Sequence, residues 1–251
     1  MLSMMRRLLV LLLALAGASM ALADPSRPGG GEPGADDAWT FKLTPSYYST
    51  SHQTGATDIN QRANLGPHAF WLGYYRRGNE FEQTRTGYEH TFQAPFGKLV
   101  PSLQLASHGF AGGSVNVEAG DQVFALLGFG RTNARDYYNL NFDPNDSALY
   151  GLGTRLLPGA TLSLFTIRDN RLHTDQVVNH LVWRYQADER QRWTADLSRK
   201  HGKPDAEGES VAGSALAVTY DYRAVFFRLA RDRKVNFSPE DQTRVSLGMR
   251  F

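Results

Sequence analysis

Hydrophobic and polar side chains alternate along most of the chain after Trp39, in segments of roughly 8 to 13 residues. The last segment shows the pattern most clearly. One parity carries Val245, Leu247, Met249 and Phe251, and the other carries Arg244, Ser246, Gly248 and Arg250. Because successive side chains of a strand point to opposite faces, this alternation predicts a strand with one apolar and one polar face.

The same pattern recurs along the whole chain, and turn residues separate the segments. The clearest breaks are Gly66-Pro67-His68, Arg77-Gly78-Asn79 and Pro158-Gly159. We count fourteen candidate strands, or twelve if the weak early segments merge, and we find no helix-period stretch and no second domain. Pro101 falls inside one segment; since proline donates no ladder hydrogen bond, we expect a bulge there.

The segments predict an all-β fold, a single antiparallel transmembrane β-barrel of about fourteen strands. Short turns at the periplasmic end should alternate with longer polar loops at the external end. The predicted external loops span residues 51–57, 133–146, 170–175, 203–210 and 236–241. An even strand number places both termini at the periplasmic end.

The N-terminal residues predict a secretory signal peptide over residues 1–23. Arg6 and Arg7 form a positive region, Leu8 to Leu15 is uncharged and apolar, and Ala21-Leu22-Ala23 is a small-residue cleavage site. A spanning helix needs roughly 20 apolar residues, which this segment lacks. Residues 24–38 are rich in Pro, Gly and acids, so we expect a flexible periplasmic leader before a barrel over residues 39–251.

Composition agrees with export to a membrane. Cysteine is absent, so no disulfide framework supports the fold. Removing Arg6 and Arg7 leaves 25 basic residues against 25 acidic ones, so the mature chain is formally neutral and its composition gives no reason to expect a nucleic-acid partner. A negative mean hydropathy beside 12% aromatic residues suits a barrel, in which only alternate residues touch lipid.

The signal peptide, the alternating segments and the terminal Phe251 together resemble Gram-negative outer-membrane β-barrel proteins as a general class. The resemblance covers the whole chain, and no internal motif identifies a narrower family. It implies localisation in the outer membrane of a Gram-negative bacterium. It also implies that Val245, Leu247, Met249 and Phe251 form the signal read by the barrel assembly machinery, and that the barrel contacts outer-membrane lipid and lipopolysaccharide. We expect a monomer.

Function depends on the lumen, to which we assign the polar parity of each strand. The predicted lumen residues are Lys42, Arg62, Arg85, Glu89, Arg155, Asp196, Lys200, Asp221, Arg228, Arg244 and Arg250. Cations outnumber acids in this set, and fixed charges in a narrow passage decide which ions enter. We therefore expect a small passive channel that favours anionic solutes. The alternative is a structural or plugged barrel whose cations pair with the acids across the lumen.

A second alternative is a hydrolase with its site at the barrel rim. The sequence has neither the His-x-Ser-Asn arrangement of outer-membrane phospholipase nor a G-x-S-x-G elbow. The remaining candidates are Asp169, His173 and Asp175, because a carboxylate can orient an imidazole for general-base chemistry. In residue types alone this set resembles the Asp and His pairing of the omptin proteases. Such a mixture in a polar loop is more often surface chemistry, so we expect no enzymatic activity.

The longest connection, residues 133–146, combines Tyr137, Tyr138 and Phe142 with Asp136, Asp143 and Asp146. We expect an external loop whose aromatics contact lipopolysaccharide sugars or each other. Folding into the pore as a constriction, or binding of a divalent cation, are the alternatives. No metal-ligand spacing stands out along the chain, and we expect neither a metal nor another cofactor.

Overall fold

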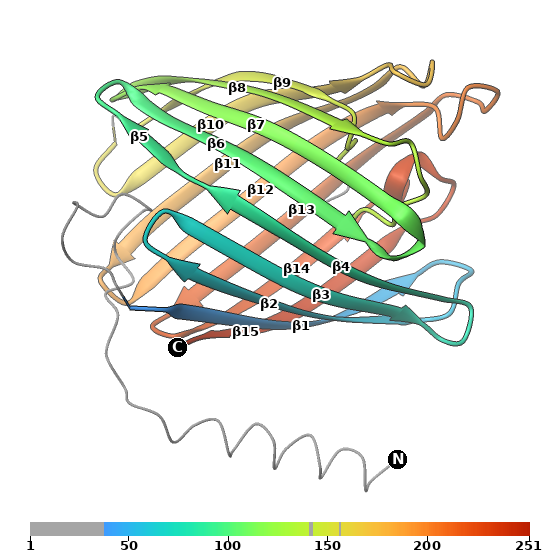
Figure 1. The fold of residues 1–251 in the computed structure, drawn as a ribbon, viewed down its shortest axis with the longest axis horizontal. Helices are drawn as coiled ribbons and strands as arrows, with labels where there is room; N and C mark the ends of the chain where they lie inside the picture. Colours follow the sequence, from blue (N-terminus) through green and yellow to red (C-terminus); the bar gives the residue numbers. More distant parts are fainter. Residues whose placement is uncertain (1–37, 141–142, 156) are drawn as a thin grey trace, which may run out of the picture.

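The computed structural model describes residues 38–140, 143–155 and 157–251. These residues form a barrel of antiparallel strands that closes on itself, with the strands strongly tilted (Figure 1). The predicted signal peptide and all of the leader except Ala38 lie outside the described residues. No helix of the described residues is long and apolar enough to cross a membrane.

The strands follow one another around the barrel in chain order. Their bounds are β1 Thr40–Thr50, β2 Ala56–Leu65, β3 His68–Arg77, β4 Phe81–His90, β5 Phe92–Ala94, β6 Gly97–Ala106, β7 Phe110–Gly120, β8 Val123–Thr132, β9 Ala148–Thr154, β10 Ala160–Asp169, β11 Gln176–Asp188, β12 Gln191–Gly202, β13 Val211–Tyr222, β14 Val225–Asp232 and β15 Gln242–Arg250. Two short 3₁₀ turns, η1 Ser107–Gly109 and η2 Val235–Phe237, lie in the connections.

Pro101 lies on β6 and interrupts its pairing with the neighbouring strand, which is therefore divided into β4 and β5. Both pair with β6 in a single register, with Glu89 opposite Ser102 and Phe92 opposite Leu99, so no residue is inserted between them. The bulge expected at Pro101 is therefore wrong. The missing proline N–H interrupts the ladder instead, and the amide of Thr91 donates to the carbonyl of Pro67 at 2.9 Å. Counted as one, β4 and β5 give the predicted fourteen-stranded barrel.

The C-terminal strand β15 closes the barrel against β1. Val245 lies opposite Tyr47 and Met249 opposite Leu43. The Phe251 and Phe41 backbones exchange two hydrogen bonds of 2.6 and 2.9 Å, and their rings stack 5.7 Å apart. The apolar parity of this strand, including Leu247, is exposed on the outer surface of the barrel.

The two ends of the barrel differ as the sequence predicts. At the end where β1 begins and β15 ends, five of the turns contain two residues between strands, as at Gly66-Pro67. The other end carries the longer connections, which project to the right in Figure 1. We call the end with the short turns the turn end and the other the loop end.

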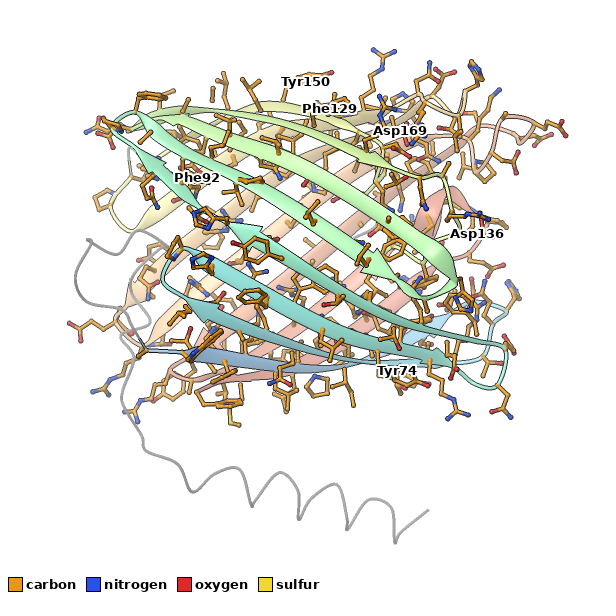
Figure 2. The ribbon with its side chains drawn as sticks, in the orientation of Figure 1. Tyr74, Phe92, Phe129, Asp136, Tyr150 and Asp169 are labelled. Atoms are coloured by element: carbon orange, nitrogen blue, oxygen red, sulfur yellow. The ribbon has the colours of Figure 1, made fainter. Side chains whose placement is uncertain are left out.

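The strand parity separates an apolar exterior from a polar interior. Leu103, Leu152 and Leu164 on the outer surface are each more than half exposed, whereas Gln83 and Ser246, polar residues of the opposite parity, are 1% and 3% exposed. Figure 2 shows Tyr74, Phe92, Phe129 and Tyr150 projecting from the outer wall. An apolar surface of this extent is stable only when a nonaqueous phase covers it.

Candidate lumen and constriction

A row of cations crosses the inner wall on three neighbouring strands. Lys42 on β1 lies directly opposite Arg62 on β2 and directly opposite Arg250 on β15. Like charges at directly opposed positions destabilise a sheet. The Lys42 amine and the Arg250 guanidinium both lie near the Phe226 ring, 4.7 and 5.1 Å from its centroid.

A carboxylate makes ion pairs at the Arg250 end of this row. Asp221 on β13 accepts hydrogen bonds from Arg250 and from Arg192, the latter at 3.2 Å. Arg228 on β14 donates instead to the Thr219 hydroxyl at 2.8 Å. Among the described residues, neither Lys42 nor Arg228 has a carboxylate partner. We call Lys42, Arg62, Arg192, Arg228 and Arg250 the basic wall.

Several other cations of the lumen are paired with acids. Arg62, at the edge of the basic wall, contacts Glu89. Arg85 pairs with Asp58 at 2.6 Å and Lys200 with Asp232 at 2.5 Å, and all four side chains are almost fully buried. These buried pairs fill space between strands, as expected for a narrow barrel with a polar interior.

A third group of charges lies at the turn end. Arg155, which follows β9, contacts Glu118, and Lys98 approaches the same carboxylate at 3.2 Å. Arg155 also lies 4.0 Å from the Phe124 ring centroid. Burial raises the free-energy cost of charging Glu118, Lys98 and Arg155, and the oppositely charged partner of each lowers that cost.

The connection between β8 and β9 folds into the barrel, so the expectation of an external loop is wrong for its described part. Tyr138 stacks on Tyr75 with 4.5 Å between ring centroids, and Tyr137 stacks on Phe110 at 4.2 Å. Tyr75 and Phe110 are only 1% and 3% exposed and lie on the inner parity. Phe142 lies outside the described residues. We call residues 133–140 and 143–147 the inserted loop.

Hydrogen bonds hold the inserted loop against the opposite wall. Arg244 donates to the carbonyl of Leu140 at 2.8 Å, and Gln242 donates to the Tyr138 hydroxyl at 2.7 Å. Both partners belong to β15, more than 100 residues away in the chain. The loop therefore crosses the lumen from β8 to the C-terminal strand, which narrows the passage.

A histidine fixes the centre of the loop. His180 on β11 has Asp143 of the loop 2.9 Å from Nε2 and Asp196 of β12 2.9 Å from Nδ1. Phe165 stacks on the same ring at 4.8 Å. A ring that donates from both nitrogens is an imidazolium, because a neutral ring has one donor and one acceptor.

Asp146 anchors the end of the inserted loop to the rim of the barrel. Its carboxylate accepts from the amide and hydroxyl of Thr132, each at 2.6 Å, and from Arg171 at 2.7 Å. Burial acts to raise the pKa of Asp146, but these hydrogen bonds outweigh it and hold the pKa below its ordinary value. The anchor is therefore ionised at neutral pH.

The wall beside the inserted loop lacks charges. A cavity of about 170 Å³ lies between the loop and β6–β9. Its lining includes Ser102, Ser114, Asn116, Gly112, Gly128 and Gly130. A Cβ on Gly130 would lie 2.7 Å from the Asn145 carbonyl oxygen, so glycine is required for this close approach. We call this surface the glycine wall.

The candidate hydrolase residues do not form a catalytic arrangement. Asp169 accepts from the amide of Arg171 at 2.8 Å, and the amide of Asp175 donates to Asn170 at 3.1 Å. No hydrogen bond joins the His173 ring to either carboxylate in the described loop, and His173 has φ of 58°. Among the described residues no group of three or more His, Cys, Asp or Glu side chains could hold a metal ion.

The structure also shows charged lumen residues that the sequence reasoning missed. Asp58 and Asp232 belong to the buried ion pairs, and Glu118 and Arg192 contact predicted lumen residues. For Asp58, Asp232 and Arg192, strand parity is the signal that could have found them, since each shares it with a residue assigned to the lumen on the same strand. Glu118 lies on β7, which had no residue assigned to the lumen. Asp143 could not have been found this way, because it belongs to a connection without a strand period.

Comparisons with known proteins identify the fold. No family model matches the sequence, and no curated protein matches it significantly. Among solved structures, the outer membrane protein Omp33 of Acinetobacter baumannii has a TM-score of 0.56 at 8% identity, over 86% of this chain and 100% of that chain. The NanC porin has a TM-score of 0.48 at 9% identity, over 83% of this chain and 98% of that chain. OccK10 (OpdN) of Pseudomonas aeruginosa has a TM-score of 0.46 at 9% identity, over 86% of this chain and 99% of that chain. The likeness to Omp33, together with closure by fourteen antiparallel strands, gives this chain the fold of a Gram-negative outer-membrane β-barrel protein.

Proposed function

We propose that this protein is a passive channel of the outer membrane whose basic lumen favours anionic solutes. The observation that carries the proposal is the cross-strand row of Arg62, Lys42 and Arg250. Like charges at opposed positions destabilise a sheet, so their placement on the inner wall is explained best by an anionic solute that binds there in passing. Arg228 extends this surface without a carboxylate partner among the described residues.

The location follows from the exterior of the barrel. Its apolar outer surface requires lipid, and a closed barrel satisfies all backbone groups within the membrane. The predicted signal peptide, cleaved near Ala23, would export the chain, and the terminal strand would be read by the assembly machinery. We infer that the loop end faces outward and that the protein acts as a monomer.

The proposed pathway has two unlike parts. Solutes would pass the glycine wall beside the inserted loop, which accepts neutral groups, and the basic wall nearer the turn end, which attracts anions. The paired charges near Asp58 and Asp232 stay with their partners and contribute little net field, because opposite charges at contact distance cancel at longer range.

Planar-bilayer recording in a salt gradient tests the proposal. We expect ion-conducting steps and a reversal potential on the anion-selective side. Replacing Lys42 and Arg228 with glutamine should weaken that preference: a unit charge about 6 Å from a permeating ion contributes roughly 0.7 kcal/mol in water, or about a threefold change in local ion concentration for each charge removed.

Arg223→Gln, in the turn between β13 and β14, is the matched control, because it removes one cation outside the lumen. It should leave selectivity unchanged. Cation selectivity of the unmodified protein would refute the role of the basic wall. Absence of any conductance would favour the alternative of a structural barrel plugged by the inserted loop.

A further inference from the structure

The outer surface carries arginines in a fixed pattern at the loop end. Within the described strands, every arginine or lysine of the outward-facing parity lies within three residues of the loop end of its strand. They are Arg76, Arg131, Arg168, Arg199 and Arg231, on β3, β8, β10, β12 and β14. All five side chains are exposed.

The turn end of the same surface differs. Aromatic residues hold the outward positions there, as in the stacked pair Trp183 and Tyr185 and the contact between Trp193 and Tyr220. Aromatic rings settle at a membrane interface of either charge. The arginines therefore distinguish one membrane surface from the other, and they lie at the surface that faces outward under the proposed orientation.

Several of these arginines have no acid to neutralise them. Arg231 pairs with Asp241 at 3.1 Å, and Arg131 lies 5.2 Å from the centroid of the Phe129 ring. By contrast, neither Arg168 nor Arg199 has a carboxylate partner among the described residues. Arg233, which follows β14, makes no ion pair in that part of the chain, although it lies close enough to Asp241 to interact with it electrostatically.

Two of these unpaired arginines border an open hollow of about 800 Å³ on the outer wall. Its floor is apolar, because Leu164, Leu181 and Leu197 stand in one cross-strand row on β10, β11 and β12. Arg199, Arg233 and Lys234 lie toward the loop end of that row, where the lining also includes Asp241, which pairs with Arg231.

Small residues on β13 create the space. Ala212 and Ser214 face outward between β12 and the segment after β14, and Ser214 lies directly opposite Arg199. The amide of Arg233 donates to the carbonyl of Ser214 at 2.9 Å, so this segment continues the sheet. The hollow thus has an apolar part toward the membrane centre and a cationic edge at its surface.

We propose that this hollow is a binding site for a phosphorylated, multiply acylated glycolipid of the outer leaflet. Arg199 and Arg233 bind a phosphate, and the leucine row receives an acyl chain. Guanidinium groups suit this role because their planar donors match phosphate oxygens in bidentate contacts. The remaining arginines of the outer surface bind phosphates of the same lipid layer. The site rests on the proposed membrane placement, but it is independent of ion conduction.

Lipid titration of the full-length barrel in phosphatidylcholine nanodiscs tests the site. Native mass spectrometry would measure retention of bisphosphorylated lipid A, dephosphorylated lipid A and phosphatidylglycerol. We expect lipid A with phosphates to bind best. The double variant Arg199→Gln and Arg233→Gln should weaken that binding by at least about tenfold, because each arginine contributes charge-assisted hydrogen bonds. Arg223→Gln, at the turn end, should bind as the unmodified protein does.

Three results would overturn the site. Equal retention of the dephosphorylated lipid would exclude phosphate recognition. Equal retention of phosphatidylglycerol would show that the arginines bind any anionic lipid and do not form a glycolipid site. Unchanged binding by the double variant would place the lipid elsewhere. Bilayer conductance of the same double variant separates the two proposals, since we expect it to match the unmodified channel whether or not lipid A binds.

Discussion

Replacing Tyr138 with alanine should release the inserted loop from the lumen. The change removes the stack on Tyr75, the hydrogen bond from Gln242 and most of the buried ring surface. An aromatic stack contributes about 1 kcal/mol, a hydrogen bond about 1 kcal/mol, and burial of a ring about 1.5 kcal/mol or more. We therefore expect the inserted position to lose about 3 kcal/mol.

The stack of Tyr137 on Phe110, the hydrogen bond to Leu140 and the contacts of Asp143 and Asp146 must then hold the loop without Tyr138. A change of about 3 kcal/mol lowers the ratio of inserted to released loop roughly 150-fold. Planar-bilayer recording should then show larger and noisier single-channel steps, and liposome swelling should show faster entry of neutral sugars. Tyr138→Phe, which keeps the stack and loses the hydroxyl, should give a smaller shift of about fivefold.

The control is Tyr150→Ala on the outer wall. Tyr150 is 49% exposed on the lipid-facing side of β9 and does not reach the lumen (Figure 2). Its removal should leave conductance unchanged. The reasoning would be refuted if Tyr138→Ala and Tyr150→Ala conduct alike, because the ring would then not limit the passage.

Two further predictions concern charged contacts. Asp58→Asn should destabilise the barrel by about 3 to 5 kcal/mol, because it leaves Arg85 buried without its partner. Glu89→Gln, at the partly exposed pair with Arg62, should cost at most about 1 kcal/mol. Urea unfolding in lipid vesicles measures both losses of stability, and equal losses would contradict the argument. Asp146 has a lowered pKa, so its anchor is complete above the ordinary aspartate pKa of about 4 and is lost as pH falls through the lower folded value. Acidification should therefore increase current noise, and Asp146→Asn should show that noise at neutral pH; a quiet Asp146→Asn channel would refute the anchor.

The architecture could be predicted because a membrane barrel imposes one rule on every strand. Alternate residues must be apolar, so a period of two recurs and its breaks locate the turns. The terminal strand shows this best, since its exposed Val245, Leu247 and Met249 are the residues that the pattern assigned to lipid. The effect of Pro101 was harder to predict, because a missing donor can be accommodated by a bulge or by a gap in the ladder.

The lumen was less predictable for a physical reason. Parity assigns a side chain to the inside, but it does not show whether an oppositely charged side chain from another strand pairs with it, as Asp58 pairs with Arg85. The inserted loop has no period at all. Its path depends on contacts such as the one between Leu140 and Arg244, which join residues 104 positions apart. Such contacts join segments far apart in the chain, so no local sequence pattern predicts them.

The division of the lumen into a basic wall and a glycine wall has a consequence for orientation. A molecule that passes the inserted loop meets small uncharged groups there, and it meets the cations of the basic wall nearer the turn end. A solute with its negative groups at one end can match both regions at once, whereas one with charge all around must leave part of it unmatched. The barrel would therefore sort solutes by how their charge is distributed as well as by its sign.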